Sequence, residues 1–187
     1  MPGPKRSGFV YDNDTGYAEL ATQFRGKGSS VFIGFLQSSG MYKPKAVDEG
    51  RKSSGPPAPP RAPITVAQIA AIHEFGSSDG KHPPQRSFMG STLDVKDYQL
   101  RLLLTKLLGK VVDGDMPQGI ALGLVGQQCV DWFRAAITAG LKPALSAATL
   151  ARKGAGKTTP LIDTGQLIGS ISWELRKANG SPGGKAK

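Results

Sequence analysis

Two long amphipathic segments joined by a very short connector constrain the fold of this chain more than any other feature. The connector "DGD", 113–115, is too short for a calcium loop and is typical of a turn between helices. The preceding segment has an apolar stripe at helical spacing, formed by Leu100, Leu103, Leu104, Leu107 and Val111. Ser91 and Asp94 indicate its N-terminal cap, and Asp97 with Arg101 forms an outward i,i+4 pair. The sequence therefore predicts a helix that begins near Ser91.

The second segment begins around Asp115, Pro117 and Gln118 and runs to about Ala139. Its predicted stripe contains Leu122, Val125, Cys129, Trp132 or Phe133, and Ala136. Three glycines, Gly119, Gly123 and Gly126, also lie in this segment, although each costs about 1 kcal/mol relative to alanine in a helix interior. Their spacing favours close approach of another helix, including one across a subunit boundary; the alternative is a frayed helix end.

Shorter elements surround this helical pair. Thr65 and Gln68 form a capping box for a helix that stops at Gly76, and Ser146 caps another short helix. Asp163 and Gln166 indicate a further capping box before the alternating stretch 170–176. That alternation predicts a half-solvated strand, which we expect to pair in antiparallel fashion with the apolar strand 30–36. The predicted fold class is α+β: a small antiparallel sheet packed with three to four helices, with long Pro/Gly-rich arms.

Composition shifts divide the chain into three parts. We predict an N-terminal arm at 1–29, one α+β domain at 30–177 and a flexible tail at 178–187. Within the domain, residues 37–63 lose all periodicity and include the basic, Pro-rich stretch "KSSGPPAPPRAP". We interpret this loop as an arm that contacts a partner.

The net charge of +10 lies mostly outside the predicted core. Residues 1–63 carry nine Lys/Arg against five acids and 143–187 carry seven against two, whereas 64–142 carry eight against seven. This distribution suits a polyanion or an acidic partner surface; the alternative is a solvated, solubilising surface. The single cysteine, Cys129, excludes an intrachain disulfide, and no apolar run approaches a membrane span. These features favour a protein made in a reducing cytosol, with no membrane partner.

Residues that carry catalytic chemistry are scarce. The two histidines, His73 and His82, and one cysteine give no standard zinc spacing. His73 lies beside Glu74 on the apolar side of a short helix, which favours a hydrogen-bonded core or interface histidine over a general base. We find no nucleophile motif and no paired carboxylates. The sequence therefore predicts no enzyme, and no catalytic, cofactor-binding or metal-binding residues.

Two further sequence features bear on the binding of nucleotides and nucleic acids. "GKT" at 156–158 resembles part of a phosphate loop, but Ala151 replaces the first glycine and Pro160 follows at once. We therefore predict no nucleotide binding. Aromatic residues make up 7% of the chain and do not alternate with the basic clusters, so the sequence favours non-specific nucleic-acid contact over sequence readout.

Four patches between residues 64 and 176 carry a family resemblance: "IAAIHEFG", "PPQRSFMG", "ALSAATLARKG" and "PLIDTGQLIGSI". Together they resemble the neck and tail-completion proteins of long-tailed bacteriophages, which include head–tail joining and tail-terminator proteins. Ser87 stands where that family usually has proline. The matching positions are His73, Glu74, Phe75, Gly76, Pro84, Arg86, Phe88, Leu145, Ser146, Thr149, Leu161, Asp163, Thr164, Gly165, Leu167, Ser170 and Ile171.

This resemblance implies a structural virion protein that is assembled in the host cytoplasm. It implies a ring, six-fold by analogy, at the head–tail junction or the upper end of the tail. The implied partners are further copies of the chain and the neighbouring neck, connector and tail-tube proteins, with non-specific contact to viral DNA through the basic arms. The alternative function is a basic nucleic-acid-associated binding protein without catalysis. The interface residues that the resemblance indicates are His73, Glu74, Phe75, Arg86, Phe88, Asp163, Thr164 and Gly165.

Overall fold

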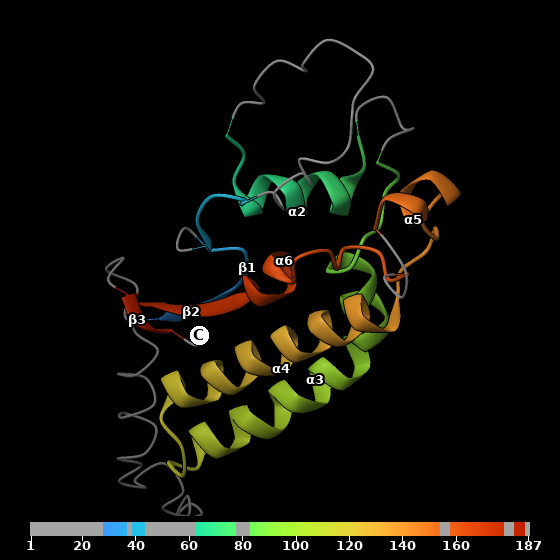
Figure 1. Cartoon of the computed structure of the whole chain (residues 1–187). Helices are drawn as coiled ribbons and strands as arrows, with labels where there is room; N and C mark the ends of the chain where they lie inside the picture. The colour runs from blue at the N-terminus through green and yellow to red at the C-terminus, as the bar shows by residue number, and fades with distance from the viewer. Residues whose placement is uncertain are drawn as a thin grey trace, which may run out of the picture.

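A computed structural model gives the fold of the chain. It describes residues 28–36, 39–43, 63–77, 83–153, 158–177 and 182–185. The fold is α+β, as predicted, with an antiparallel sheet covered on one face by α4, and α3 packed beneath α4 (Figure 1). Most of the N-terminal arm, most of the 37–63 loop and His82 lie outside the described residues.

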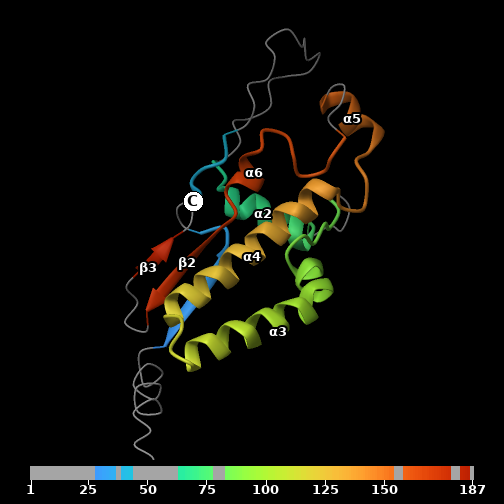
Figure 2. The ribbon, with the colours of Figure 1, turned by 90° about the horizontal axis from the view of Figure 1, so that it is seen from below.

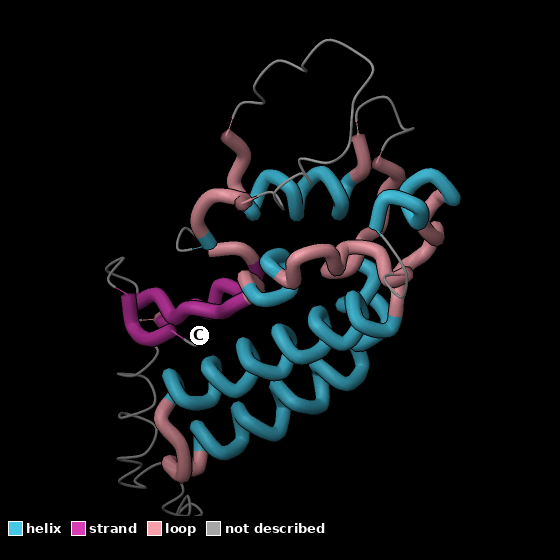
Figure 3. The backbone as a smooth tube through the Cα atoms, viewed as in Figure 1, coloured by secondary structure: helices cyan, strands magenta, loops and turns pink. Residues whose placement is uncertain are grey.

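The sheet contains three antiparallel strands in the order β1-β2-β3 (Figure 3). Strand β1, Ser29–Gly34, pairs with β2, Ser172–Lys177, so that Val31 lies opposite Leu175 and Ile33 opposite Trp173. The predicted pairing of the two strands is confirmed. The third strand, β3, Pro182–Lys185, corrects the prediction of a flexible tail at 178–187. Its sequence, Pro-Gly-Gly-Lys, has no strand-forming side chain, so only the backbone pairing with β2 reveals it.

The helical hairpin agrees with the sequence prediction. Helix α3, Gly90–Val112, and α4, Gln118–Ala139, pack against each other, and the view from below shows α3 as the outer of the two (Figure 2). Leu107 and Val111 are buried and Leu100 and Leu103 are partly buried, but Leu104 is 42% exposed. The stripe on α3 is therefore narrower than predicted, because among the described elements α4 provides the main contact with it.

The glycines of α4 meet a strand rather than a helix. A Cβ atom on Gly126 would lie 2.7 Å from Cγ of Trp173 and 2.9 Å from Cγ2 of Val31, and one on Gly123 would lie 3.0 Å from Cη2 of Trp173. These glycines thus let the indole of Trp173 lie directly against the helix backbone. The prediction of close helix approach was wrong: the approaching element is β2 of the same chain.

Two of the three short helices have the N-terminal caps that the sequence predicts. Helix α2, Val66–Phe75, has the Thr65–Gln68 capping box, and Gly76 ends it with φ of 81°. Helix α5, Ala147–Lys153, follows Ser146, whose hydroxyl oxygen accepts the N–H of Thr149 at 3.3 Å. Helix α6, Gln166–Gly169, lacks the predicted Asp163 cap; the hydroxyl of Thr164 accepts the N–H of Gln166 instead.

The two ends of the 37–63 loop meet beside α2. Met41 forms an isolated antiparallel bridge with Thr65, and the N–H of Tyr42 donates to the carbonyl of Ile64 at 2.9 Å. The side-chain amide of Gln166 accepts from the N–H of Lys43 and donates to the carbonyl of Met41. Lys43 and Ile64, which flank the segment 44–62 in the sequence, are therefore held close together.

Candidate interface site and the junction of the motif segments

The carboxylate of Glu74 joins the end of α2 to the beginning of α3. It accepts hydrogen bonds from the backbone N–H groups of Phe88, Met89 and Gly90 at 2.8, 3.0 and 2.9 Å. The hydroxyl of Ser87 donates to the same carboxylate at 2.6 Å. A negative charge at a helix N-terminus is stabilised by the unpaired N–H groups and by the helix dipole. Glu74 therefore caps α3 from another helix, and α3 begins at Gly90, close to the predicted start near Ser91.

Opposing effects act on the pKa of Glu74. Burial raises the pKa of its carboxyl, but the hydrogen bonds from Ser87, Met89, Gly90 and Phe88 together lower it by more. The net pKa of Glu74 is below its ordinary value, so the group stays ionised at neutral pH. The capping interaction is therefore present under ordinary conditions.

The guanidinium of Arg86 forms the second connection of this region. Its Nε donates to the carbonyl of Pro143 at 2.8 Å and its Nη2 donates to the carbonyl of Ala144 at 3.2 Å. The backbone N–H of Arg86 donates to the carbonyl of His73 at 2.7 Å. We call the set Glu74, Arg86, Ser87–Gly90, Pro143 and Ala144 the motif junction, because it joins three of the patches that carry the family resemblance.

Phe88 and Arg86 are not exposed interface residues. Phe88 is completely buried and Arg86 is 5% exposed. The ring of Phe88 packs edge-on against Phe35, with centroids 5.9 Å apart. The prediction that these two side chains contact another protein is corrected: both the charged hydrogen bond and the apolar anchor exist, but their partners belong to the same chain.

His73 is partly buried beside this junction. Its Nδ1 is buried without a hydrogen-bond partner, which matches a histidine held in the neutral form. Burial lowers the pKa of His73, and the nearby positive charge of Arg86 lowers it further. His73 thus lies at the edge of the core, as the sequence favoured, but it has no partner for proton transfer among the described residues.

The remaining predicted interface residues are accessible. Phe75 is 76% exposed at the end of α2, and Asp163 and Thr164 are exposed before α6. Gly165, with φ of 76°, is the left-handed residue that begins α6. Helix α6 contacts α2, and Gln166 bonds to Met41, which pairs with Thr65 at the N-terminal end of α2, whereas Glu74 of the motif junction lies at the other end of that helix.

Sequence reasoning missed an exposed apolar stripe on α3. Val95, Tyr98 and Leu102 are 74, 69 and 53% exposed and lie at i, i+3 and i+7, on the face opposite Leu107 and Val111. We call these three residues the α3 outer face. Leu108 and Val112, 54 and 47% exposed, extend the apolar surface toward the end of the helix. The pattern was visible in the sequence, but the stronger leucine stripe of the same helix obscured it.

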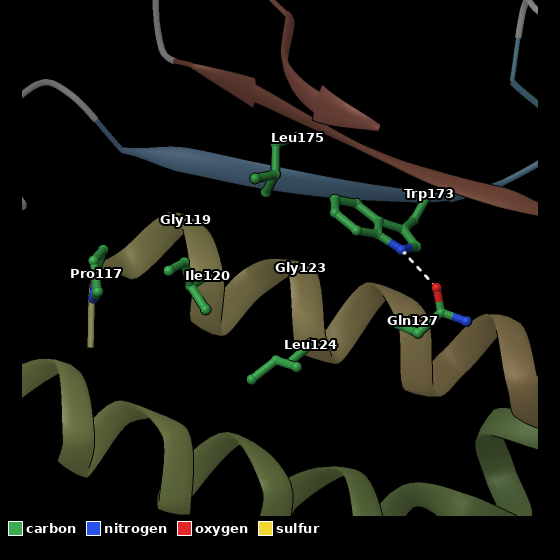
Figure 4. Close-up of a pocket in the computed structure, with 8 residues that line it drawn as sticks. All are labelled: Pro117, Gly119, Ile120, Gly123, Leu124, Gln127, Trp173 and Leu175. Atoms are coloured by element: carbon green, nitrogen blue, oxygen red, sulfur yellow. Dashed lines mark hydrogen bonds between the residues drawn. The ribbon is translucent and has the colours of Figure 1, made fainter. Parts of the chain in front are cut away.

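A second apolar surface lies between β2 and α4 (Figure 4). We call this cavity of about 600 Å³ the β2–α4 groove; Pro117, Gly119, Ile120, Gly123, Leu124, Gln127, Trp173 and Leu175 line it. The indole N–H of Trp173 donates to the side-chain oxygen of Gln127 at 3.2 Å, so the polar edge of the indole is satisfied. The groove therefore presents mainly apolar atoms to its surroundings.

Two further features concern metal ions and membranes. Across the residues that the structure describes, no group of three or more His, Cys, Asp or Glu side chains is arranged to hold a metal ion. In the same part of the chain, no helix combines the length and apolarity needed to cross a bilayer. Comparison with family models, with curated proteins and with solved structures gave no match for this chain.

Proposed function

We propose that this chain is a structural virion protein of a tailed phage that forms a ring at the head–tail junction or at the upper end of the tail. The observation that carries the proposal is the motif junction. Glu74 and Arg86 hydrogen-bond to segments 13 to 58 residues away. Hydrogen bonds thus join the patches that resemble the neck and tail-completion proteins to one another. Such dependence supports a shared fold more strongly than four short unconnected sequence matches.

The exposed apolar surfaces support the assembly part of the proposal. Tyr98 and Leu102 on the α3 outer face have no covering element among the described residues, and exposed apolar patches mark contact sites in soluble proteins. In a ring, each copy presents one surface and receives another, so modest contacts add up over all subunits. The protein then acts by offering surfaces in fixed symmetry, without chemistry on its partners.

Electron microscopy of the purified protein, alone and mixed with tails, tests this function. We expect rings for the wild-type chain and single subunits for Leu102→Asp, which places a charge on the α3 outer face. Lys142→Asp, an exposed position in the loop after α4 and away from the α3 outer face, is the control and should leave the rings intact. Unfolding by urea should give the same midpoint for Leu102→Asp as for the wild type, because Leu102 is already 53% exposed.

A deletion lysate tests the site of action. Phage without the protein should accumulate separate heads and tails, with head proteins processed normally. Normal joined virions, or an arrest before any head is built, would contradict the proposal. Binding of the purified chain to DNA without any ring would favour the nucleic-acid alternative instead.

A further inference from the structure

The α3 outer face is the first part of a longer line of exposed positions on the same helix. After Leu102, three further exposed residues continue the alternating spacing of three and four residues. The opposite side of α3 is buried against α4. A line of this spacing on a helix is the contact surface of a two-helix pair. We call its six positions the α3 seam: Val95, Tyr98, Leu102, Thr105, Gly109 and Val112.

Gly109 lies in this seam without a structural reason inside its own subunit. Its backbone is ordinary α-helix, outside the left-handed region that favours glycine. No atom lies within 4 Å of the position that an added Cβ would take. Because glycine weakens the interior of a helix relative to alanine, the isolated subunit gains nothing from it. A glycine at such a position does allow a neighbouring helix to approach closely.

The two halves of the seam complement each other in size. The N-terminal half contains the large side chains of Tyr98 and Leu102, whereas the C-terminal half contains Thr105 and Gly109. When two copies pair in antiparallel fashion with full overlap, each large side chain therefore meets a small one. The opposing positions are Val95 with Val112, Tyr98 with Gly109, and Leu102 with Thr105, and twofold symmetry makes each contact occur twice.

A parallel pair fits the same seam less well. It places Gly109 opposite Gly109 of the second copy, which leaves a gap between the helices, and it places Arg101 on one flank beside Lys106 on the other. In the antiparallel pair each flank meets the same flank of the second copy. Lys106 then lies beside Gln99, and Arg101, which keeps its ion pair with Asp97, lies beside Leu108.

The length of the seam sets the strength of such a contact. From Val95 to Val112 it extends about 26 Å at 1.5 Å per residue. Two helices in contact over this length bury roughly 1,000 Å² in total, the lower limit for a specific interface. We therefore expect pairs that form and separate reversibly at micromolar concentrations of the protein.

We propose that two copies of this chain pair through the α3 seam, antiparallel to each other, about a twofold axis between Leu102 and Thr105. Helix α3 is the outer helix of the hairpin, so a second copy approaches from the side away from α4 (Figure 2). The inference concerns two free subunits and does not depend on the proposed function. A paired subunit cannot offer the α3 outer face to a ring, so the pair must separate before a ring forms.

Disulfide trapping between full-length chains tests both the contact and its direction. One variant carries Val95→Cys and the other Val112→Cys, at positions that are 74 and 47% exposed. In the antiparallel pair these two positions oppose each other, within the Cα separation of about 7 Å that a disulfide requires. Cys129 remains in both variants: it is buried, and burial raises the pKa of its thiol, so it does not compete.

Each cysteine variant alone is the matched control. In the antiparallel pair, Val95 lies about 26 Å along the helix from Val95 of the second copy, so neither variant can link to itself. We expect the equimolar mixture to form disulfide-linked dimers at least tenfold faster than either variant alone, on gels without reducing agent. Equal rates, or no link in the mixture, would overturn the proposal; rapid linking of each variant alone would indicate a parallel pair and overturn it as well.

A measurement without added cysteines uses the space at Gly109. Gly109→Phe fills the site that Tyr98 of the second copy occupies and should raise the dissociation constant of the pair at least tenfold in sedimentation equilibrium. Lys110→Phe, one position further and outside the seam, should leave that constant unchanged. Equal constants for the two variants would contradict the pairing. Rings in micrographs without the disulfide would overturn only the pairing, whereas the disulfide without rings would contradict only the proposed ring.

Discussion

The motif junction and the α3 outer face use polar and apolar residues in opposite ways. At the junction, charged side chains are hydrogen-bonded within the chain: the half-buried Glu74 accepts four hydrogen bonds, and the buried Arg86 donates to two carbonyl groups. On the outer face, Val95 and Tyr98 expose apolar surface to solvent. Glu74, Arg86 and Phe88, which look functional in the sequence, therefore stabilise the fold of the chain, whereas Val95 and Tyr98, which look like ordinary helix positions, are exposed.

Because of this difference, we expect substitutions in the two regions to affect different properties, namely stability and association. A substitution in the junction should act on the free energy of unfolding, because it leaves buried groups without partners or creates a cavity. A substitution on the outer face should act on association and leave folding nearly unchanged. The following four predictions test the junction, or the packing beside it, against exposed positions.

Phe88→Ala should have the largest effect on stability. Removal of a completely buried phenylalanine leaves a cavity beside Phe35 and should lower the free energy of unfolding by about 3–5 kcal/mol. Phe75→Ala is the matched control; because Phe75 is 76% exposed, we expect a change of less than about 0.5 kcal/mol. Urea unfolding measures both. A small effect of Phe88→Ala would contradict the tight packing of Phe88 against Phe35.

Glu74→Gln should cause the next largest loss in the free energy of unfolding. The amide keeps one acceptor oxygen but loses the negative charge and the second acceptor, which leaves N–H groups at the start of α3 unpaired. We expect a loss of about 2 kcal/mol, since hydrogen bonds to charged groups contribute more than neutral ones. Asp163→Asn, at an exposed carboxylate, should change nothing measurable in the same experiment. Equal losses of stability for Glu74→Gln and Asp163→Asn would contradict the capping of α3 by Glu74.

Gly126→Ala and Gly109→Ala should have opposite signs. A methyl group on Gly126 would clash with Trp173 and Val31, and such overpacking should cost about 1–3 kcal/mol. Gly109 in α3 has open space around an added Cβ, so alanine there should stabilise the protein by up to about 1 kcal/mol. Thermal unfolding of the two variants decides the sign. Stabilisation by both would show that Trp173 does not lie against α4.

Acidification should weaken the junction gradually, which is the smallest expected effect. The pKa values of His73 and Glu74 are both lower in the folded chain than their ordinary values of 6.5 and 4.5. The unfolded state therefore binds more protons, and stability falls as pH decreases below about 6.5, and again below about 4.5. His73→Asn should remove the first decline and Glu74→Gln the second, in urea unfolding followed from pH 8 to pH 3. A stability that rises on acidification would contradict both assignments.

Local signals in the sequence predicted much of the fold. The capping box at Thr65, the stop at Gly76 and the pairing of the two apolar strands follow from short-range patterns, and the structure confirms them. Strand β3 could not be predicted, because Pro-Gly-Gly-Lys has no side-chain periodicity, and its pairing with β2 depends on long-range backbone register. The glycines of α4 correctly indicated close approach, but the identity of the approaching element is a property of tertiary packing.

The candidate site was less predictable. The motif residues were identified, but their partners are 13 to 58 positions away, so sequence spacing could not show that Glu74 caps α3 or that Arg86 holds the backbone before α5. For the same reason Phe88 was interpreted as an anchor for a partner protein. The exposure of Tyr98 and Leu102 depends on the absence of a covering element among the described residues, which no local pattern contains.

The bridge between Met41 and Thr65 has a consequence for how this domain tolerates change in length. The residues on either side of 44–62 are held together, because Tyr42 hydrogen-bonds to Ile64 and Lys43 to Gln166. Loop-closure entropy grows slowly with length, by about 0.6 kcal/mol for each doubling. We therefore expect Met41 and Tyr42 to stay paired with Thr65 and Ile64 when the number of residues between these flanks is changed.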